Sequence, residues 1–401
     1  MPLTSITNTA NETGKLQTLA LWLIVASSAS ISLPTPLLSL TTGLFLVVWL
    51  LIGLTGHNFG ELFKKIWGNP VTKVSLLLWF AIALGMSWSS TTWQEAWNGF
   101  GKYRELLLLP LMASLLTEGW GKRVFYGFLV GHIIAMLLSY FQWIGYAPLS
   151  KGVMPSGFHS HIPFATFEAF LIYACLFLGF YDKTRRNLFF LLSAIMLFNL
   201  LFINTGRTGF LVLALLALTF MITQWKGKGL IAYLVIATLA FGLLYQYSPT
   251  FKKRLIQETT QEIELAEVNS NMGDYHLRPT LWKNALLIIQ ENPLTGFGTG
   301  SFLHEYKRIS GAESKNPHQQ FLLTWVELGI GGLFLLCYLL YTQWKTSRHL
   351  PIPNQYIAYG FLIAFILHSF LNSSIMDNVE GHFYALMSVA LWADNKSWVS
   401  T

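Results

Sequence analysis

The sequence predicts an all-α polytopic membrane protein with about 12 transmembrane helices and one large helical loop on the outer side. Hydrophobic residues make up 53% of the 401 residues and charged residues only 11%, whereas about a quarter of an ordinary soluble domain is charged. The apolar residues are gathered in runs of about 20, the length that a helix needs to cross a bilayer. The net charge of +7 is explained by orientation in the membrane, and no nucleic-acid partner is expected.

The apolar runs follow one another along the whole chain. The least regular is 103–117, because Pro110 interrupts it and the charged residues Lys102, Arg104 and Glu105 lie at its start. A re-entrant or tilted helix fits this range equally well. No cleavable signal peptide is visible, so the first run is expected to stay. The predicted spans are 16–32, 37–55, 71–89, 103–117, 124–145, 162–181, 188–204, 208–225, 229–247, 319–341, 356–372 and 380–394.

Every second short connection is rich in lysine and arginine, as in 183–186 and 226–228. Cytoplasmic loops carry such an excess, so this side and both termini are predicted to be cytoplasmic. The opposite short connections hold only Lys102, Arg104, Lys151 and Arg207. The chain therefore divides into spans 1–9 (1–247), an outer loop (248–318) and spans 10–12 (319–401).

The outer loop 248–318 is predicted to be a small helical cap on the membrane face. A helix is expected to begin at Pro279 and to stop before Pro293. Glycines then indicate a bent, tight connection; they are Gly296, Gly298, Gly300 and Gly311. In the first part of the loop, apolar side chains alternate with charges; they are Leu255, Ile263, Leu265 and Val268.

Three polar side chains on the outer side are the main candidates for chemistry. Arg207 is the one charge in the short connection NTGRTGF, where it either binds a ligand or reaches towards lipid headgroups. Arg278 precedes a helix, whose N-terminus favours anions; it either binds phosphate or pairs with Asp274. His318 opens the next helix and either exchanges a proton near neutral pH or caps the helix.

No metal site or cofactor is expected. His159 and His161 have a metal-like spacing but no nearby cysteine or carboxylate partner. Paired carboxylates, which a divalent-metal site would need, do not occur in the outer loop sequence. No phosphate-cradling glycine-rich motif occurs, and the inner loops are too short for nucleotide chemistry.

Four segments resemble the O-antigen ligase and polymerase family. They are TGRTGF with Arg207, the spacing of Arg278, Trp282 and Ala285, the turn ENPLTGFGTGSF, and PHQQFLLTWVELGIGG with His318. The resemblance implies an inner-membrane glycosyltransferase of the lipid-linked-donor (GT-C-like) architecture, which takes a glycan from undecaprenyl diphosphate at a periplasmic active site. It matches both arginines and the histidine to functional residues of the family. Gly206 and Gln319 replace the family's frequent Ser and Asn, which leaves the hydrogen-bond partner of His318 open.

The resemblance implies that Arg207 and Arg278 hold the diphosphate and that His318 is a general base. The favoured acceptor is a sugar hydroxyl of lipid A-core; an O-antigen polymerase and a lipid-linked oligosaccharide flippase are the alternatives. Further outer-side candidates are Lys102, Arg104, His161 and Asp377. Lys102 and Arg104 either steer anionic substrates or anchor the chain in membrane lipids, and Asp377 either orients His318 or a sugar or is an ordinary turn residue. All of this requires Arg207, Arg278 and His318 to converge.

Overall fold

A computed structural model describes residues 3–56, 59–149, 154–204, 206–248, 252, 278–394 and 396–399, and within these residues the fold is helical without strands. Eight stretches of this described part of the chain are long and apolar enough to cross a membrane: 35–55, 70–88, 120–143, 161–181, 186–203, 207–247, 320–347 and 354–371. The prediction of a polytopic helical membrane protein is therefore confirmed. The count of twelve spans and the GT-C-like architecture stay predictions.

The helices of the first half are α1 (Leu3–Ser30), α2 (Thr35–Gly56), α3 (Phe59–Gly68), α4 (Pro70–Gly85), α5 (Trp93–Phe100), α6 (Glu105–Leu115), α7 (Trp120–Trp143), α8 (His161–Tyr181) and α9 (Arg186–Phe198). Those of the second half are α10 (Arg207–Tyr247), α13 (Arg278–Glu291), α14 (Phe302–Ser310), α15 (Gln320–Ser347), α16 (Asn354–Leu371) and α17 (Asn378–Trp392). α6 has 11 residues, so it is only about 16 Å long and is too short to span alone.

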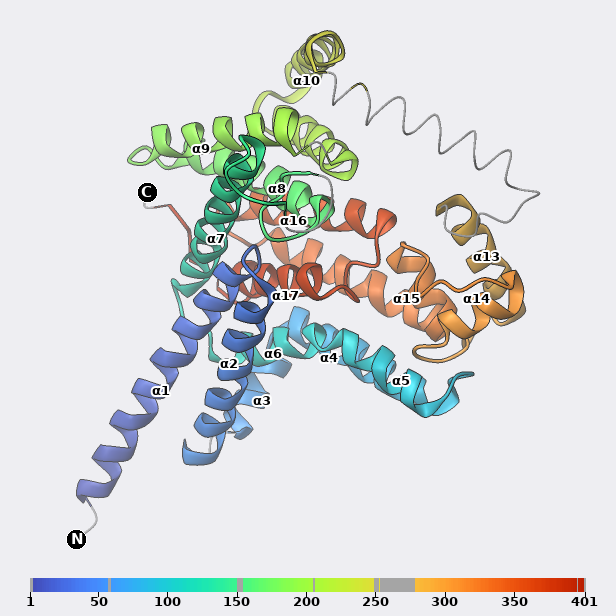
Figure 1. Ribbon diagram of the computed structural model, residues 1–401. Helices are drawn as coiled ribbons and strands as arrows, with labels where there is room; N and C mark the ends of the chain where they lie inside the picture. The colour runs from blue at the N-terminus through green and yellow to red at the C-terminus, as the bar shows by residue number, and fades with distance from the viewer. Residues whose placement is uncertain are drawn as a thin grey trace.

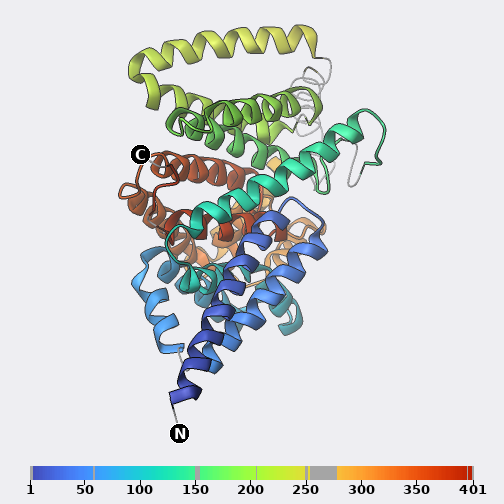
Figure 2. The same ribbon diagram turned by 90° about the vertical axis from the view of Figure 1, so that its left-hand side faces the viewer.

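The ranges 208–225 and 229–247 form the two arms of α10, which is broken between them at Lys226 (φ 53°, ψ −132°). A Cβ added to Gly229 would lie 2.0 Å from the Met221 carbonyl oxygen. The chain therefore folds back sharply at this point, and Figure 2 shows the two arms of α10 on either side of the bend. The basic residues at the bend remain consistent with a short connection between two spans.

Aromatic packing around α8 forms the centre of the molecule. The Phe167 ring lies 4.3 Å from that of Phe383 on α17, and Phe128 on α7 lies 5.1 Å from Phe383. Many large apolar side chains face outwards, for example Leu54 and Leu84 at 62% and 64% exposed. A soluble protein rarely exposes so much apolar surface, whereas lipid covers it in a membrane.

α13 and α14 lie with the first turn of α15 at one end of the molecule, and the C-terminal segment lies at the other (Figure 1). Their core joins residues of all three helices, including Leu281, Phe302 and Leu323. The helix predicted between Pro279 and Pro293 is confirmed, since α13 ends at Glu291. The four glycines of the predicted bent connection all have positive φ. Asp274 and the apolar positions 255, 263, 265 and 268 lie outside the described residues, as does Lys151.

The segment ENPLTGFGTGSF is held between α4 and a break in α15. Phe297 N and Gly298 N donate to the carbonyl oxygens of Val326 (2.9 Å) and Glu327 (2.8 Å), and Thr299 N donates to that of Gly85 (3.1 Å). α15 is interrupted close by, at Gly329 (φ 65°). A Cβ added to Gly329 would lie 2.1 Å from the Leu294 carbonyl oxygen, so glycine is needed both for the backbone angle and for the close approach. This packing fixes the start of α15.

Candidate functional site

The start of α13 is joined to the residue before His318. Arg278, Trp282 and Ala285 are spaced four and three residues apart, so they lie on one face of the helix. Ala285 is fully buried, and Trp282 Nε1 donates a hydrogen bond to the Pro317 carbonyl oxygen at 3.1 Å. The same face therefore brings Arg278 towards His318, and the arginine charge lowers the pKa of the imidazole after the larger effect of burial.

His318 has a left-handed backbone (φ 50°), which is uncommon outside glycine. Its N–H donates to Asn316 Oδ1 at 2.8 Å, and Ser373 Oγ donates to the same oxygen at 3.3 Å. Gln319 serves as the N-cap of α15, where its side chain accepts from Leu322 N. Gln319, which differs from the residue frequent in the family, therefore caps the helix. Local hydrogen bonds hold His318 in a strained conformation.

His318 lies at the surface, but neighbouring atoms partly enclose its ring, which has an amide as its neighbour. Burial and the Arg278 charge lower its pKa, and a side-chain hydrogen bond with Asn372 acts in the opposite direction. Asn372 Nδ2 lies 3.5 Å from His368 Nε2, and His368 Nδ1 lies 2.8 Å from Ser374 Oγ. The turn 372–377, between α16 and α17, therefore supplies the partner of His318 that the sequence left open.

Asp377 lies at the N-cap of α17 in the same turn. Burial raises the pKa of its carboxyl group, and the charge of Lys102 partly offsets this effect. Arg104 Nη2 donates to Asn378 Oδ1 at 2.6 Å, and Arg104 Nε lies 3.2 Å from Glu105 Oε1. These contacts place Arg104 against the start of α17, and Lys102 is near enough to Asp377 for its charge to act on that carboxyl group.

A buried polar network continues from this point into the bundle. Tyr103 Oη donates to Glu327 Oε2 at 3.3 Å, and Gly300 N donates to Glu327 Oε1 at 3.1 Å. Gln320 Oε1 accepts from Ile375 N at 2.9 Å. The network joins α15 to the segment before α6, to the glycine connection and to the turn 372–377. It therefore fixes the relative positions of the segments that carry the candidate residues.

Arg207 and His161 begin α10 and α8, which lie side by side. A Cβ added to Gly206 would lie 3.1 Å from the His161 carbonyl oxygen, and one added to Gly209 would lie 2.5 Å from the Ala165 Cβ. The glycines of NTGRTGF thus permit close approach of two helix starts. Farther along, Phe220 packs on Phe177 at 4.9 Å, so the two helices run in the same direction.

α16 runs the opposite way, since Tyr356 near its start lies 5.0 Å from Phe177 near the end of α8. Its last residue therefore lies at the end of the bundle where α8 and α10 begin. The structure thus brings Arg278 near enough to His318 for its charge to lower the pKa of the imidazole, and it places Lys102, Arg104 and Asp377 about the turn 372–377. It places Arg207 and His161 at the same end. The full convergence of Arg207 with Arg278 and His318 stays a prediction.

Asn316, Asn372 and Ser373 were missed from the sequence. They occupy connections and have no motif or periodicity, and their only signal was proximity in the chain to a helix end. Within the part of the chain that the structure describes, no group of three or more His, Cys, Asp or Glu could hold a metal ion. The described groups that act on His318 are the guanidinium group of Arg278 and the amide group of Asn372.

Comparison with known proteins agrees with the sequence motifs. Residues 191–337 match a family model described as O-antigen ligase. The chain is also 28% identical over 300 residues to an O-antigen ligase of Salmonella typhimurium, a match that covers 70% of each chain. The range 191–337 includes Arg207, Arg278 and His318. The resemblance to the O-antigen ligase family is therefore confirmed.

Proposed function

From this match to the O-antigen ligase family, we propose that the protein transfers O-antigen polysaccharide from undecaprenyl diphosphate to a sugar hydroxyl of lipid A-core. The reaction takes place at the periplasmic face of the bacterial inner membrane, with both termini in the cytoplasm. The observation that carries the proposal is the proximity of Arg278 to His318, through which the arginine charge acts on the imidazole, together with the bond from Trp282 on the same helix to Pro317. An imidazole beside a cation at a helix start suits a hydroxyl nucleophile and an anionic leaving group.

His318 is the general base. Its pKa lies below the ordinary value of 6.5, because burial and the Arg278 charge disfavour the imidazolium form. The imidazole is therefore mainly neutral at pH 7 and can accept a proton. Asn372 raises the pKa through its hydrogen bond, as an amide oxygen does when it accepts from a ring N–H. The other ring nitrogen is then the acceptor, and base catalysis of this kind contributes roughly 10²- to 10⁴-fold.

Arg207 and Arg278 hold the diphosphate. Each is the first residue of a helix, where backbone N–H groups and the helix dipole already favour an anion. A guanidinium group adds a planar pair of donors that matches two phosphate oxygens. The two arginines stabilise the charge that develops on the leaving group, and a metal ion is not required.

The transfer is a single displacement. The acceptor hydroxyl oxygen attacks the anomeric carbon as its proton passes to His318, and the bond from that carbon to the diphosphate oxygen breaks. The electron pair of the broken bond remains on undecaprenyl diphosphate, which the arginines hold. Attack opposite the leaving group inverts the anomeric centre. Lys102, beside Asp377, contributes positive charge for the anionic acceptor.

The test replaces His318 with Ala in the purified full chain and measures transfer from undecaprenyl-diphosphate-linked glycan to rough lipopolysaccharide. We expect transfer to fall by roughly 10²- to 10⁴-fold while donor binding is kept. His349→Ala is the matched control, because His349 is exposed and lies after α15, at its other end. Unchanged turnover in His318→Ala would reject the proposed base. Lengthening of donor in the absence of lipopolysaccharide would indicate a polymerase, and lipid movement without transfer would indicate a flippase.

A second test replaces each arginine with lysine. Lysine keeps the charge but cannot reproduce the planar donor pair, so Arg207→Lys and Arg278→Lys should each weaken donor binding and transfer. Arg186→Lys is the control, since Arg186 is an exposed residue that begins α9 at the opposite end. Wild-type rates in both outer variants would contradict the role of the guanidinium groups.

A further inference from the structure

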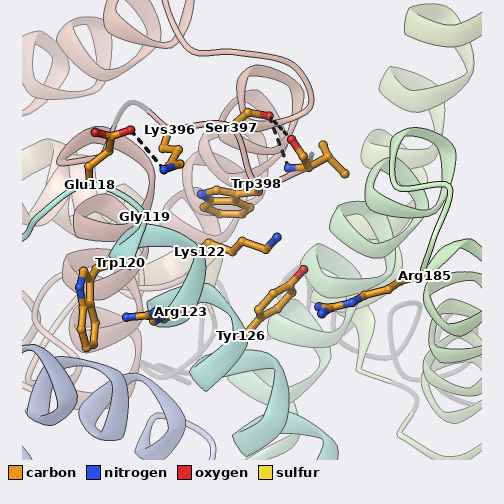
Figure 3. Close-up of a pocket in the computed structure, with 11 residues that line it drawn as sticks. Glu118, Gly119, Trp120, Lys122, Arg123, Tyr126, Arg185, Lys396, Ser397 and Trp398 are labelled. Carbon is orange, nitrogen blue, oxygen red and sulfur yellow. Dashed lines mark hydrogen bonds and ion pairs between the residues drawn. The ribbon is translucent and has the colours of Figure 1, made fainter. Parts of the chain in front are cut away.

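A cavity of about 740 Å³ lies at the basic end of the bundle, away from the candidate catalytic residues. It is enclosed by the start of α7, the connection before α9 and the C-terminal segment 396–399. Figure 3 shows side chains from these three parts of the chain around the cavity. We call it the basic pocket.

Positive charge predominates in the basic pocket. Lys122, Arg123, Arg185 and Lys396 line it, and Glu118 is its one carboxylate. Glu118 Oε1 lies 3.4 Å from Lys396 Nζ and neutralises that lysine. Just outside the lining, the Asp182 carboxylate accepts from the backbone N–H groups of residues 184 and 185. The remaining cations are like charges in a shared space, and Lys122 and Arg185 are near enough to repel each other.

One buried polar atom in the lining, Trp398 Nε1, has no hydrogen-bond partner among the described residues, whereas the Tyr126 hydroxyl interacts with Arg185. Trp398 is 1% exposed, and an indole N–H can only donate. Figure 3 shows its nitrogen on the ring edge turned towards Lys396, and shows the Tyr126 hydroxyl turned towards Arg185. Leaving such a donor unpaired is unfavourable. A ligand with several anionic oxygens would accept a hydrogen bond from this N–H and offset the repulsion between the cations.

The pocket opens where a lipid headgroup would lie. Trp120 begins α7 and packs edge to face on Trp22 at 5.3 Å, and Trp22 is 54% exposed. Tryptophans of this kind are enriched at membrane interfaces. The neighbouring surface of α9 is apolar, with Leu188 and Leu191 more than half exposed. We infer that the basic pocket binds the phosphate headgroup of an acidic phospholipid, whose acyl chains lie against this surface; basic pockets between membrane helices bind such headgroups.

The experiment measures binding of phosphatidylglycerol and of phosphatidylcholine to the purified full chain by native mass spectrometry. We expect preference for phosphatidylglycerol. Lys122→Gln and Arg185→Gln should each reduce that preference about fivefold, the worth of one cation near an anionic lipid surface. Lys183→Gln is the matched control, because Lys183 is exposed on the same connection but does not line the pocket.

Trp398→Phe tests the buried donor without changing the charge. It should also reduce phosphatidylglycerol binding, with the phosphatidylcholine signal unchanged. If this variant does not fold, as its Tm would show, the two charge variants decide the outcome. Equal binding of the two lipids, or an equal loss in Lys183→Gln, would overturn the proposal. Displacement of the lipid by inorganic phosphate at millimolar concentration would also overturn it, since the ligand would then be a soluble phosphate.

Discussion

Trp282→Phe separates the position of His318 from its chemistry. The substitution keeps an aromatic ring at the start of α13 and deletes the N–H that donates to the Pro317 carbonyl oxygen at 3.1 Å. A neutral hydrogen bond of this kind contributes about 0.5–1.5 kcal/mol. The neighbouring His318 has φ 50°, and a left-handed non-glycine residue costs about 1–3 kcal/mol. The free energy of the lost hydrogen bond is thus comparable with the cost of the left-handed backbone at His318, which the surrounding contacts must offset.

If the whole loss falls on the placement of His318, the transfer rate drops about two- to tenfold. The assay is the initial rate of glycan transfer to rough lipopolysaccharide at saturating donor, together with the Tm of each variant. Trp325→Phe is the matched control, because Trp325 Nε1 makes the same kind of bond, to the Pro293 carbonyl oxygen at 3.0 Å, away from the histidine. A wild-type rate in Trp282→Phe, or equal losses in both variants, would refute the reasoning.

Three further predictions address titration, backbone and metal. Because the pKa of His318 is lowered, the base is lost only as pH falls below 6.5; Arg278→Gln should move the acid limb of the pH–rate profile to higher pH, and Asn372→Leu should move it to lower pH. If the acid limb moved in the same direction in both variants, this assignment would be contradicted. Gly298→Ala should lower the free energy of unfolding by more than about 1 kcal/mol, because φ is +88° and the added Cβ would lie 2.2 Å from a backbone atom; Gly101→Ala, with φ −59° and open space, should not, as Tm measurements would show. Excess EDTA should leave transfer intact, and activity restored only by Mg²⁺ would count against the two-arginine mechanism.

The sequence alone determined the features that depend on neighbouring residues. Apolar runs predicted the helices, because a helix in lipid needs about 20 such residues. Pro279 and Pro293 predicted the bounds of α13, and the glycines predicted the positive-φ connection that follows it. Arg278 and His318 could be named together because each stood at a predicted helix start with chemistry suited to an anion or a proton. The sequence did not show that the two helix starts lie close together; the hydrogen bond from Trp282 on α13 to the Pro317 carbonyl oxygen connects them.

The tertiary structure decided what depends on segments distant in the chain. The partner of His318 is Asn372, 54 residues later, and no local pattern distinguishes that amide from other loop residues. The break at Gly329 likewise lies inside an apolar run, 319–341, that looks continuous, whereas the basic residues at 226–228 already indicated the fold-back at Lys226. The basic pocket unites three segments from positions 118 to 399. Local propensity fixes where a helix begins and ends, whereas only the packing of one helix against another fixes which side chains share a site.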